Sequence, residues 1–252
     1  MSGEKTRAVV LRTQAYRESS IIAWLYTETR GLVHGIAKGI RRRSKAQSLL
    51  ERGTLVDAVV FFKPHRSLQT LSQIRILEFF PGTRNGLMKS AVRDVAFELA
   101  LQGVTQEETH PELFSLLLEF LTILDRMPRA RAVPLALWDF CNRLSVLLGF
   151  GLNLRACVEC GSTAIGQHGG VLVHRQGGFL CTSCGGHRTD TEHVSGDIIR
   201  GLRGESEPPL DLSTTDRRRT TRLLTSYCAW HFETHKALKA LEFLESLLGP
   251  EV

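Results

Sequence analysis

Four of the six cysteines in this 252-residue chain form two Cys-x-x-Cys pairs, Cys157 with Cys160 and Cys181 with Cys184. A two-residue spacer lets one tight turn present both thiolates to a single ion, and Zn²⁺ prefers four such ligands in a tetrahedron. The spacing therefore predicts a zinc site. The alternative, four unrelated buried cysteines, does not account for two matched pairs separated by a ribbon-like interval.

The number of thiols indicates which kind of zinc site this is. A catalytic zinc keeps one coordination position open for water, whereas four cysteines close the shell. We therefore expect Zn²⁺ to be structural and expect no catalytic residues around it. One of the nearby histidines could in principle replace a cysteine, although four thiols already satisfy the ion; these are His168, His174, His187 and His193.

The residues between and beside the pairs predict how the thiols are held. Each pair is followed by glycine, Gly161 or Gly185, which can adopt the left-handed conformation that turns a backbone around a metal. Between the pairs, two short apolar runs at 171–174 and 179–180 flank a Gly-rich turn, which is typical of a hairpin. The whole segment, 155–187, is predicted to be a zinc ribbon.

The N-terminal third has a pattern typical of strands. Runs rich in β-branched and aromatic residues lie at 7–12, 21–26, 32–37, 54–62 and 68–80, separated by turn-like segments. Five short strands suit a small closed barrel, because closure removes exposed sheet edges. The five-stranded oligonucleotide-binding barrel (OB-fold) is our prediction for residues 1–82, and an SH3-like barrel fits the same pattern.

After Pro81 the hydrophobic period lengthens to that of helices. Apolar stripes predict helices around 92–99, 113–124 and 137–148, and further helices at 195–203, from a Ser213 cap onward, and at 237–248. We therefore predict an α+β protein, in which the barrel is followed by an all-helical domain at 83–252 that the ribbon interrupts.

The positive charge is concentrated in the predicted barrel. Residues 1–83 hold 14 Lys and Arg against 6 Asp and Glu, although the net charge of the whole chain is +6. The densest cluster lies between the third and fourth predicted strands and consists of Lys38, Arg41, Arg42, Arg43 and Lys45. Such a loop could bind nucleic-acid phosphates through electrostatic contacts that carry no sequence information, or it could be only a soluble loop.

Two other groups of residues can each be interpreted in two ways. Trp24, Tyr26, Phe61 and Phe62 could stack on single-stranded bases, although aromatic residues in apolar runs more often fill a core. A second basic cluster, made of Arg217, Arg218, Arg219 and Arg222, could extend an anion-binding surface or only solubilise the start of a helix.

Motif searches exclude several classes of protein. The chain has no Walker loop, no dinucleotide fingerprint, no His-Glu-x-x-His and no Gly-x-Ser-x-Gly. It has no run of 18 uncharged apolar residues and no apolar stretch behind its polar start. We expect a cytoplasmic protein without a membrane partner, and reduced thiols fit that compartment.

The chain resembles the RecO family of bacterial DNA repair and recombination mediators over nearly its whole length. The resemblance is carried by Ala8-Val-Val-Leu-Arg-Thr13, Tyr16-Arg-Glu-Ser19, Gly31-Leu-Val33, Ala37-Lys-Gly-Ile-Arg-Arg42, Leu71-Ser-Gln73 before Phe79-Phe-Pro81, the two cysteine pairs and the tail 227–244. The order and spacing of these motifs are more specific than any one of them.

This resemblance implies a non-enzymatic, nucleoid-associated protein that binds single- and double-stranded DNA and anneals complementary strands. It also implies three protein partners: RecR, the acidic C-terminal tail of single-stranded-DNA-binding protein, and RecA, whose loading the family assists. The family's barrel and basic surface are its DNA side, which makes Lys38, Arg41, Arg42, Arg43 and Lys45 the candidate DNA-binding residues.

Two other classes of function remain possible at this point. An interaction adaptor with a structural zinc and an incidental basic loop would bind proteins tightly and DNA negligibly. A metal-dependent nuclease would need divalent-dependent turnover, and the missing catalytic motifs argue against it.

Overall fold

The five predicted strands form, each longer or shorter than its apolar run by a few residues. They are β1 (Glu4–Tyr16), β2 (Ser20–Thr27), β3 (Gly31–Ala37), β4 (Leu55–Phe61) and β5 (Gln69–Glu78). The computed structural model describes residues 3–40, 47–106, 108–128, 133–186, 193–205, 212–232 and 236–249. Its elements group into two compact units, Met1–Gly86 with Val104–Arg126, and Leu87–Gly103 with Met127–Val252.

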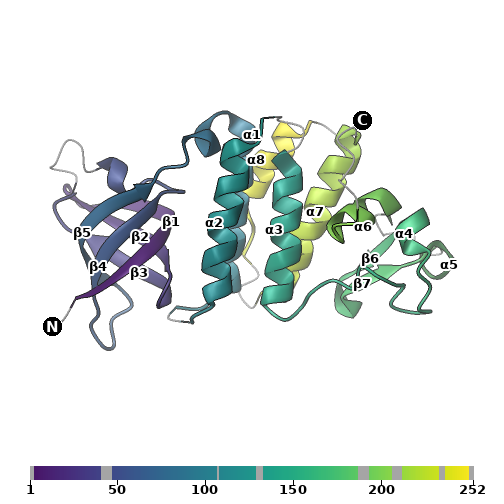
Figure 1. Ribbon diagram of the computed structural model, residues 1–252, viewed down its shortest axis with the longest axis horizontal. Coiled ribbons are helices and arrows are strands. Elements are labelled where there is room, and N and C mark those ends of the chain that lie inside the picture. The colour runs from purple at the N-terminus through teal and green to yellow at the C-terminus, as the bar shows by residue number, and fades with distance from the viewer. Residues whose placement is uncertain are drawn as a thin grey trace. The chain divides into compact units, whose positions relative to one another are not determined.

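The strands close into a barrel in the order β1-β2-β3-β5-β4. All neighbours are antiparallel except β3 and β5, whose three parallel pairs join Gly35–Ala37 to Gln69–Leu71. This mixed five-stranded barrel, drawn in purple and blue in Figure 1, has the strand order of an oligonucleotide-binding barrel and confirms the predicted fold.

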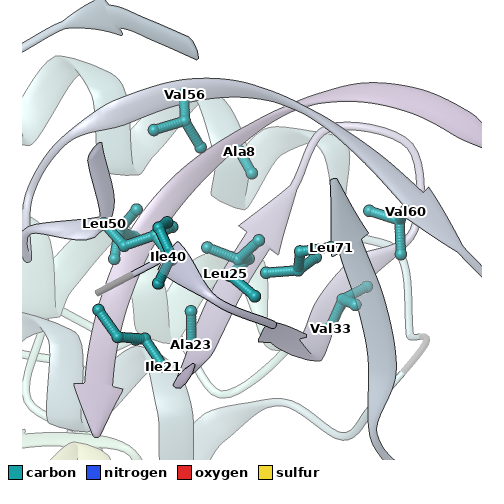
Figure 2. Packing of buried hydrophobic residues seen from close by; sticks show 12 residues of the cluster. Ala8, Ile21, Ala23, Leu25, Val33, Ile40, Leu50, Val56, Val60 and Leu71 are labelled. Carbon is teal, nitrogen blue, oxygen red and sulfur yellow. The ribbon is translucent and has the colours of Figure 1, made fainter. Parts of the chain in front are cut away.

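Side chains that alternate along the strands fill the barrel. Ala23 and Leu25 of β2 point inward with Val33 of β3, and Leu71 of β5 meets them (Figure 2). The cluster has twelve buried members: Ala8, Val10, Ile21, Ala23, Leu25, Val33, Ala37, Ile40, Leu50, Val56, Val60 and Leu71. Burying each larger aliphatic side chain contributes on the order of 2 kcal/mol, so this interior fixes the strand register.

One helix joins the barrel in the first unit. Helix α2 (Pro111–Arg126) buries one apolar face, with Leu113, Leu117 and Leu121 fully covered. The segment before it contacts the barrel closely, because the Tyr26 hydroxyl donates to the carbonyl of His110 at 3.1 Å. Gly31 has φ +60°, and a Cβ there would lie 1.9 Å from the Glu108 carbonyl oxygen. Only glycine permits this approach.

The second unit is built from helices. They are α1 (Leu87–Gly103), α3 (Val133–Leu147), α6 (Gly196–Leu202), α7 (Thr214–His231) and α8 (Lys239–Leu247). Helix α1 packs on α3, α7 and α8, and α3 packs on α7. The predicted Ser213 cap forms, since its hydroxyl accepts from the Asp216 amide at 3.0 Å. Trp138 donates to the Thr221 hydroxyl at 2.9 Å, which satisfies a buried indole N–H between α3 and α7.

The cysteine-bearing segment lies between α3 and α6. It contains α4 (Ile165–His168), β6 (Gly170–Val173), η5 (His174–Gln176), β7 (Gly178–Leu180), α5 (Thr182–Gly185) and β8 (His193–Val194). Strands β6 and β7 form the predicted hairpin, with Gly177 in the left-handed conformation at its turn. The third strand, β8, pairs with β6 and was not predicted, because two residues are too few to show a period.

The α+β class and the order of parts are thus confirmed, and the domain boundaries at 1–82 and 83–252 stay a prediction. The first unit also contains the short 3-10 helices η2 (Gln47–Leu50) and η3 (Pro81–Arg84). Among the described helices, none combines the length and apolar composition that crossing a bilayer requires.

Candidate metal centre and nucleic-acid interface

The fold brings the two cysteine pairs together. Cys157 and Cys160 lie in the loop after α3, Cys181 directly follows β7, and Cys184 lies in α5. Cys157 and Cys181 are buried, Cys184 is half-buried and Cys160 is exposed. The four sulfurs all lie within 4.8 Å of one another.

The first pair sits in a knuckle that local polar groups shape. The Asn153 carboxamide oxygen accepts from the amides of Arg155 and Ala156 at 3.1 and 3.3 Å, which turns the chain just before Cys157. The Gly161 amide then donates to the Cys157 carbonyl at 2.9 Å. Gly161 has φ +74° as predicted, a conformation that a side chain would strain.

The second pair is shaped differently, and here the prediction for Gly185 was wrong. Gly185 ends the short helix α5 and donates to the Cys181 carbonyl at 2.8 Å, without a positive φ. A Cβ at this position would lie 3.2 Å from the Val171 side chain and 3.3 Å from Leu180. A side chain here would press on the β6–β7 hairpin, which would have to shift by a few tenths of an ångström, so glycine favours close packing at this position.

The distances between the sulfurs suit a tetrahedral ion. With metal–sulfur bonds of about 2.3 Å, the edges of a tetrahedron are about 3.8 Å long. The sulfurs of Cys160 and Cys181, one from each pair, are 3.8 Å apart. The four cysteines are therefore suited to holding a single metal ion.

The electrostatics of the cluster favour partial ionisation. Burial opposes ionisation of Cys157, yet hydrogen bonds from the amides of Cys160, Cys181 and Glu159 lower its pKa to about 6. The hydrogen bond with Cys160 raises the pKa of Cys184 to about 12. Some thiols thus release protons readily while their neighbours retain theirs. A divalent cation would stabilise all four as thiolates and displace the remaining protons.

The described histidines lie outside this cluster. His168 is exposed at the end of α4 and His193 is exposed on β8. The Nε2 atom of His174 lies 3.2 Å from the Ser226 hydroxyl on α7, and its ring neighbours those of Tyr227 and Trp230. His187 lies outside the described residues.

The basic loop begins where β3 ends. Lys38 is exposed directly after the strand, Gly39 turns the chain with φ +69°, and Ile40 returns to the barrel interior. Arg41, Arg42, Arg43 and Lys45 lie outside the described residues. The structure therefore places one of the five candidate DNA-binding cations, on the outside of the barrel.

The aromatic residues of the barrel have separate positions. Tyr26 is fully buried beneath the segment that precedes α2. Phe62 packs partly on the core cluster, and Phe61 is half-buried at the end of β4. Trp24 is half-buried, and the Arg12 guanidinium lies over its ring. No sequence pattern indicated the pairing of Arg12 with Trp24.

Three arginines of the second basic cluster make contacts inside the second unit. Arg217 donates to the Leu212 carbonyl at 2.5 Å, and Arg218 to the Gly249 carbonyl at 2.8 Å. Arg222 pairs with Glu245 of α8 at 2.8 Å. These contacts tie α7 to its neighbours and leave less of the cluster's charge for a ligand.

A mixed five-stranded barrel, followed by helices and an inserted segment with a four-thiol cluster suited to a metal ion, defines a class of two-part protein. Comparison with protein families gives two matches: "Recombination protein O N terminal" over residues 1–80 and "Recombination protein O C terminal" over residues 85–241. The chain belongs to the RecO family of DNA repair proteins.

Individual relatives are similar in sequence over most or nearly all of the chain. DNA repair protein RecO of Symbiobacterium thermophilum is 32% identical over 260 residues, covering 95% of each chain. The protein of the same name from Frankia casuarinae is 32% identical over 251 residues, covering 96% of this chain and 98% of the relative. That of Anaeromyxobacter sp. strain Fw109-5 is 38% identical over 184 residues, 71% of this chain and 70% of the relative.

Proposed function

We propose that this protein is a non-enzymatic recombination mediator. It binds single- and double-stranded DNA and anneals complementary strands. With RecR, it helps RecA load on single-stranded DNA coated by single-stranded-DNA-binding protein. The observation that carries the proposal is the basic loop on the barrel, which opens with exposed Lys38 at the end of β3 in a chain of this family.

Annealing makes few chemical demands on a protein. Two polyanions must be neutralised and held close while their bases stay free to pair. A loop with five cations in eight residues supplies sequence-independent contacts of this kind. We assign DNA binding to residues 1–82, through Lys38, Arg41, Arg42, Arg43 and Lys45.

We assign the four cysteines to a structural Zn²⁺. The proximity of their sulfurs, all within 4.8 Å of one another, supports a single ion, and four thiolates favour zinc over hard cations such as Mg²⁺. The closed ligand set leaves no position for water, so the ion would stabilise the ribbon at 155–187 within the helical domain at 83–252. When bound, Zn²⁺ would cross-link the two segments that carry the cysteine pairs, and it would take no part in a reaction on DNA.

The remaining partners follow from membership of the family. We propose that the protein joins RecR, engages the acidic tail of single-stranded-DNA-binding protein, and acts in the cytoplasm on the nucleoid. Its net charge of +6 is compatible with acidic partners and with DNA.

Charge reversal in the basic loop tests the DNA assignment. We expect the triple variant Arg41→Glu, Arg42→Glu, Arg43→Glu to weaken oligonucleotide binding and to flatten its dependence on salt, because each lost phosphate contact lowers the slope by about 0.7 to 0.9. Fluorescence anisotropy from about 50 to 200 mM salt measures both quantities.

The matched control reverses three exposed cations of the second unit, Arg175, Lys236 and Lys239. It changes the net charge equally but should leave the salt slope near that of the unmodified protein. An unchanged affinity in the loop variant would reject the DNA assignment and favour the interaction adaptor. Equal losses in both triple variants would mean that net charge alone drives binding.

A further inference from the structure

Ion pairs distinguish two groups among the cations of the barrel. Five are paired with carboxylates: Lys5 and Arg75 share Asp57, while Arg7 pairs with Glu28, Arg30 with Glu4, and Arg84 with Glu51. Within the described part of the first unit, Arg12, Lys38, Lys63 and Arg66 form no ion pair. A cation without a carboxylate partner keeps its full charge for a polyanion, so these four are the stronger candidates for phosphate contacts.

Arg12 is set apart by its position on β1. The register of β1 and β2 shifts between Val10 and Arg12, and this irregularity places Arg12 directly opposite Trp24. The guanidinium carbon lies 4.8 Å from the centre of the Trp24 ring. On the other side of Trp24 stands His34 of β3, with ring centroids 5.4 Å apart. We call Arg12, Trp24 and His34 the Arg12 rung.

The Arg12 rung lies on the outside of the barrel. The neighbours of Trp24 and His34 along their strands, Leu25 and Val33, belong to the interior cluster labelled in Figure 2. Side chains alternate between the two faces of a strand, so Trp24 and His34 point outward. Arg12 is exposed, and the two rings are half-buried.

The Arg12 rung is the first that the segment before α2 covers only in part, through Gln106 at its His34 end. The preceding rung, Val9, Tyr26 and Leu32, is buried, because Tyr26 bonds to His110 and Leu32 forms a bridge with Gln106. The following rung consists of Gln14, Ile22 and Ile36. Gln14 is exposed and Ile22 is half-buried. A partly apolar strip of sheet therefore lies open beside the Arg12 guanidinium.

The rung continues toward the loop between β4 and β5, which carries two of the other unpaired cations, Lys63 and Arg66. Gln106 hydrogen-bonds to the Nδ1 atom of His34, and its Nε2 atom also donates to the Ser67 carbonyl at 3.3 Å. That loop is held in shape by the side chain of Gln69, which accepts from the Lys63 amide at 2.7 Å and donates to the Arg66 carbonyl at 2.6 Å. The cations of the loop, Lys63 and Arg66, thus sit on an ordered support.

The stacking of Arg12 on Trp24 orients its donors. A guanidinium lying over a ring has its face covered, while its N–H groups remain at the edge, where they match two oxygens of a phosphate. Burial lowers the pKa of His34 below its ordinary value, so this ring stays uncharged at neutral pH. The rung therefore offers one oriented cation beside two flat aromatic rings.

We infer that the Arg12 rung is a contact site for single-stranded nucleic acid, in which Arg12 binds a backbone phosphate and Trp24 holds its guanidinium in place. The inference rests on the proposed DNA-binding function and names residues outside the basic loop. A flexible single strand can follow a strip of sheet and place a base beside the Arg12–Trp24 pair, against the exposed parts of the Trp24 and His34 rings. The bases of a duplex are already stacked and paired, so they would make no stacking contact with the two rings.

The test compares Arg12→Gln with Arg30→Gln in the full-length protein. Arg30 is a matched control because its guanidinium lies 5.1 Å from the Phe62 ring centre on the same barrel, yet Glu4 neutralises it at 2.9 Å. Binding of a fluorescent oligothymidylate is measured over a salt series. We expect Arg12→Gln to weaken binding about 10-fold and to reduce the salt slope by about 0.7, with little change for Arg30→Gln.

Two further variants examine the geometry. Arg12→Lys keeps the charge but loses the fork, so we expect it to retain the salt slope and lose part of the affinity. Trp24→Leu removes the platform while keeping an apolar side chain, and we expect it to weaken single-strand binding more than duplex binding. Melting curves of both variants establish that the barrel remains folded.

Equal effects of Arg12→Gln and Arg30→Gln, or no effect of either, would overturn the inference. Equal loss on single strands and duplex in Arg12→Gln would overturn the single-strand assignment. If the basic-loop triple variant also binds DNA normally, the proposed function itself fails. If that variant is impaired while Arg12→Gln behaves like Arg30→Gln, the function stands and the Arg12 rung alone is rejected.

Discussion

At the scale of single residues, glycine follows each of the two cysteine pairs for a different physical reason. Gly161 has a left-handed backbone, with φ +74°, whereas Gly185 leaves space beside Val171 and Leu180, which a Cβ would contact at 3.2 and 3.3 Å. The spacing of the cysteines predicts the cluster because each pair is a local unit. It does not predict which glycine serves which purpose, because that depends on the hairpin that packs against the second pair.

Removing one thiol tests the metal assignment. We expect Cys160→Ser to lower the zinc content from about one ion per chain to near zero, and to lower the melting temperature of the protein by several degrees, because metal binding and folding of the ribbon are coupled. Elemental analysis and calorimetry measure the two effects. Cys228→Ala, which removes a buried cysteine outside the cluster, should retain zinc. A zinc-free Cys160→Ser protein with unchanged melting would make the ribbon's metal dispensable.

His174 and His231 give the second unit a predicted sensitivity to acid. Burial lowers the pKa of both below the ordinary value of 6.5, and the charge of His231 adds to the effect on His174. As the pH falls below 6.5, the unfolded chain takes up protons at these histidines before the native state does. The free energy of unfolding therefore decreases from about pH 6.5 down through the lowered pKa values of the folded state.

The slope of stability with pH measures this effect. We expect His174→Asn to make the fall in unfolding free energy between about pH 6.5 and 5 shallower, because one proton-binding difference is removed. His168→Asn, at an exposed position on α4, should leave the slope unchanged. A His174→Asn protein with the slope of the unmodified protein would contradict the assignment.

At the scale of elements, the ribbon is attached to the helices through Arg203, directly after α6. Its Nε atom donates to the Leu154 carbonyl at 2.6 Å and its guanidinium to the Arg155 carbonyl at 3.1 Å, just before the first cysteine pair. The periodicity of the sequence predicts α6 but not this contact, because a long side chain reaching a distant loop leaves no pattern. The same limit applies to Arg12, whose partner depends on a register shift in β1.

Truncating Arg203 should loosen the first knuckle. We expect Arg203→Ala to destabilise the second unit by about 3 kcal/mol, since two hydrogen bonds from a charged donor are lost, and to weaken zinc binding by at least about 10-fold. Arg203→Lys, which keeps the charge but loses the guanidinium fork, should lie in between. Arg143→Ala, which removes a surface pair with Asp139 on α3, is the control and should have little effect. Zinc competition with a chelator distinguishes these outcomes, and equal zinc affinity in Arg203→Ala would contradict the argument.

At the scale of the whole molecule, the positive charge is unevenly distributed along the chain. The first 83 residues carry 8 more cations than anions, while the remainder carries 2 more anions than cations. The order of parts could be predicted from the sequence, since strand and helix periods differ and the cysteine spacing is specific. The grouping of α2 with the barrel could not, because an amphipathic stripe does not say which surface covers it.

The central claim, that the protein is a mediator, is tested most directly by annealing. Complementary oligonucleotides coated with single-stranded-DNA-binding protein are mixed with and without this protein, and pairing is followed by fluorescence quenching. We predict faster annealing without added nucleotide and without loss of full-length strands. Unchanged annealing by a folded, zinc-loaded protein would contradict the account and favour an adaptor, and divalent-dependent shortening of the strands would identify a nuclease.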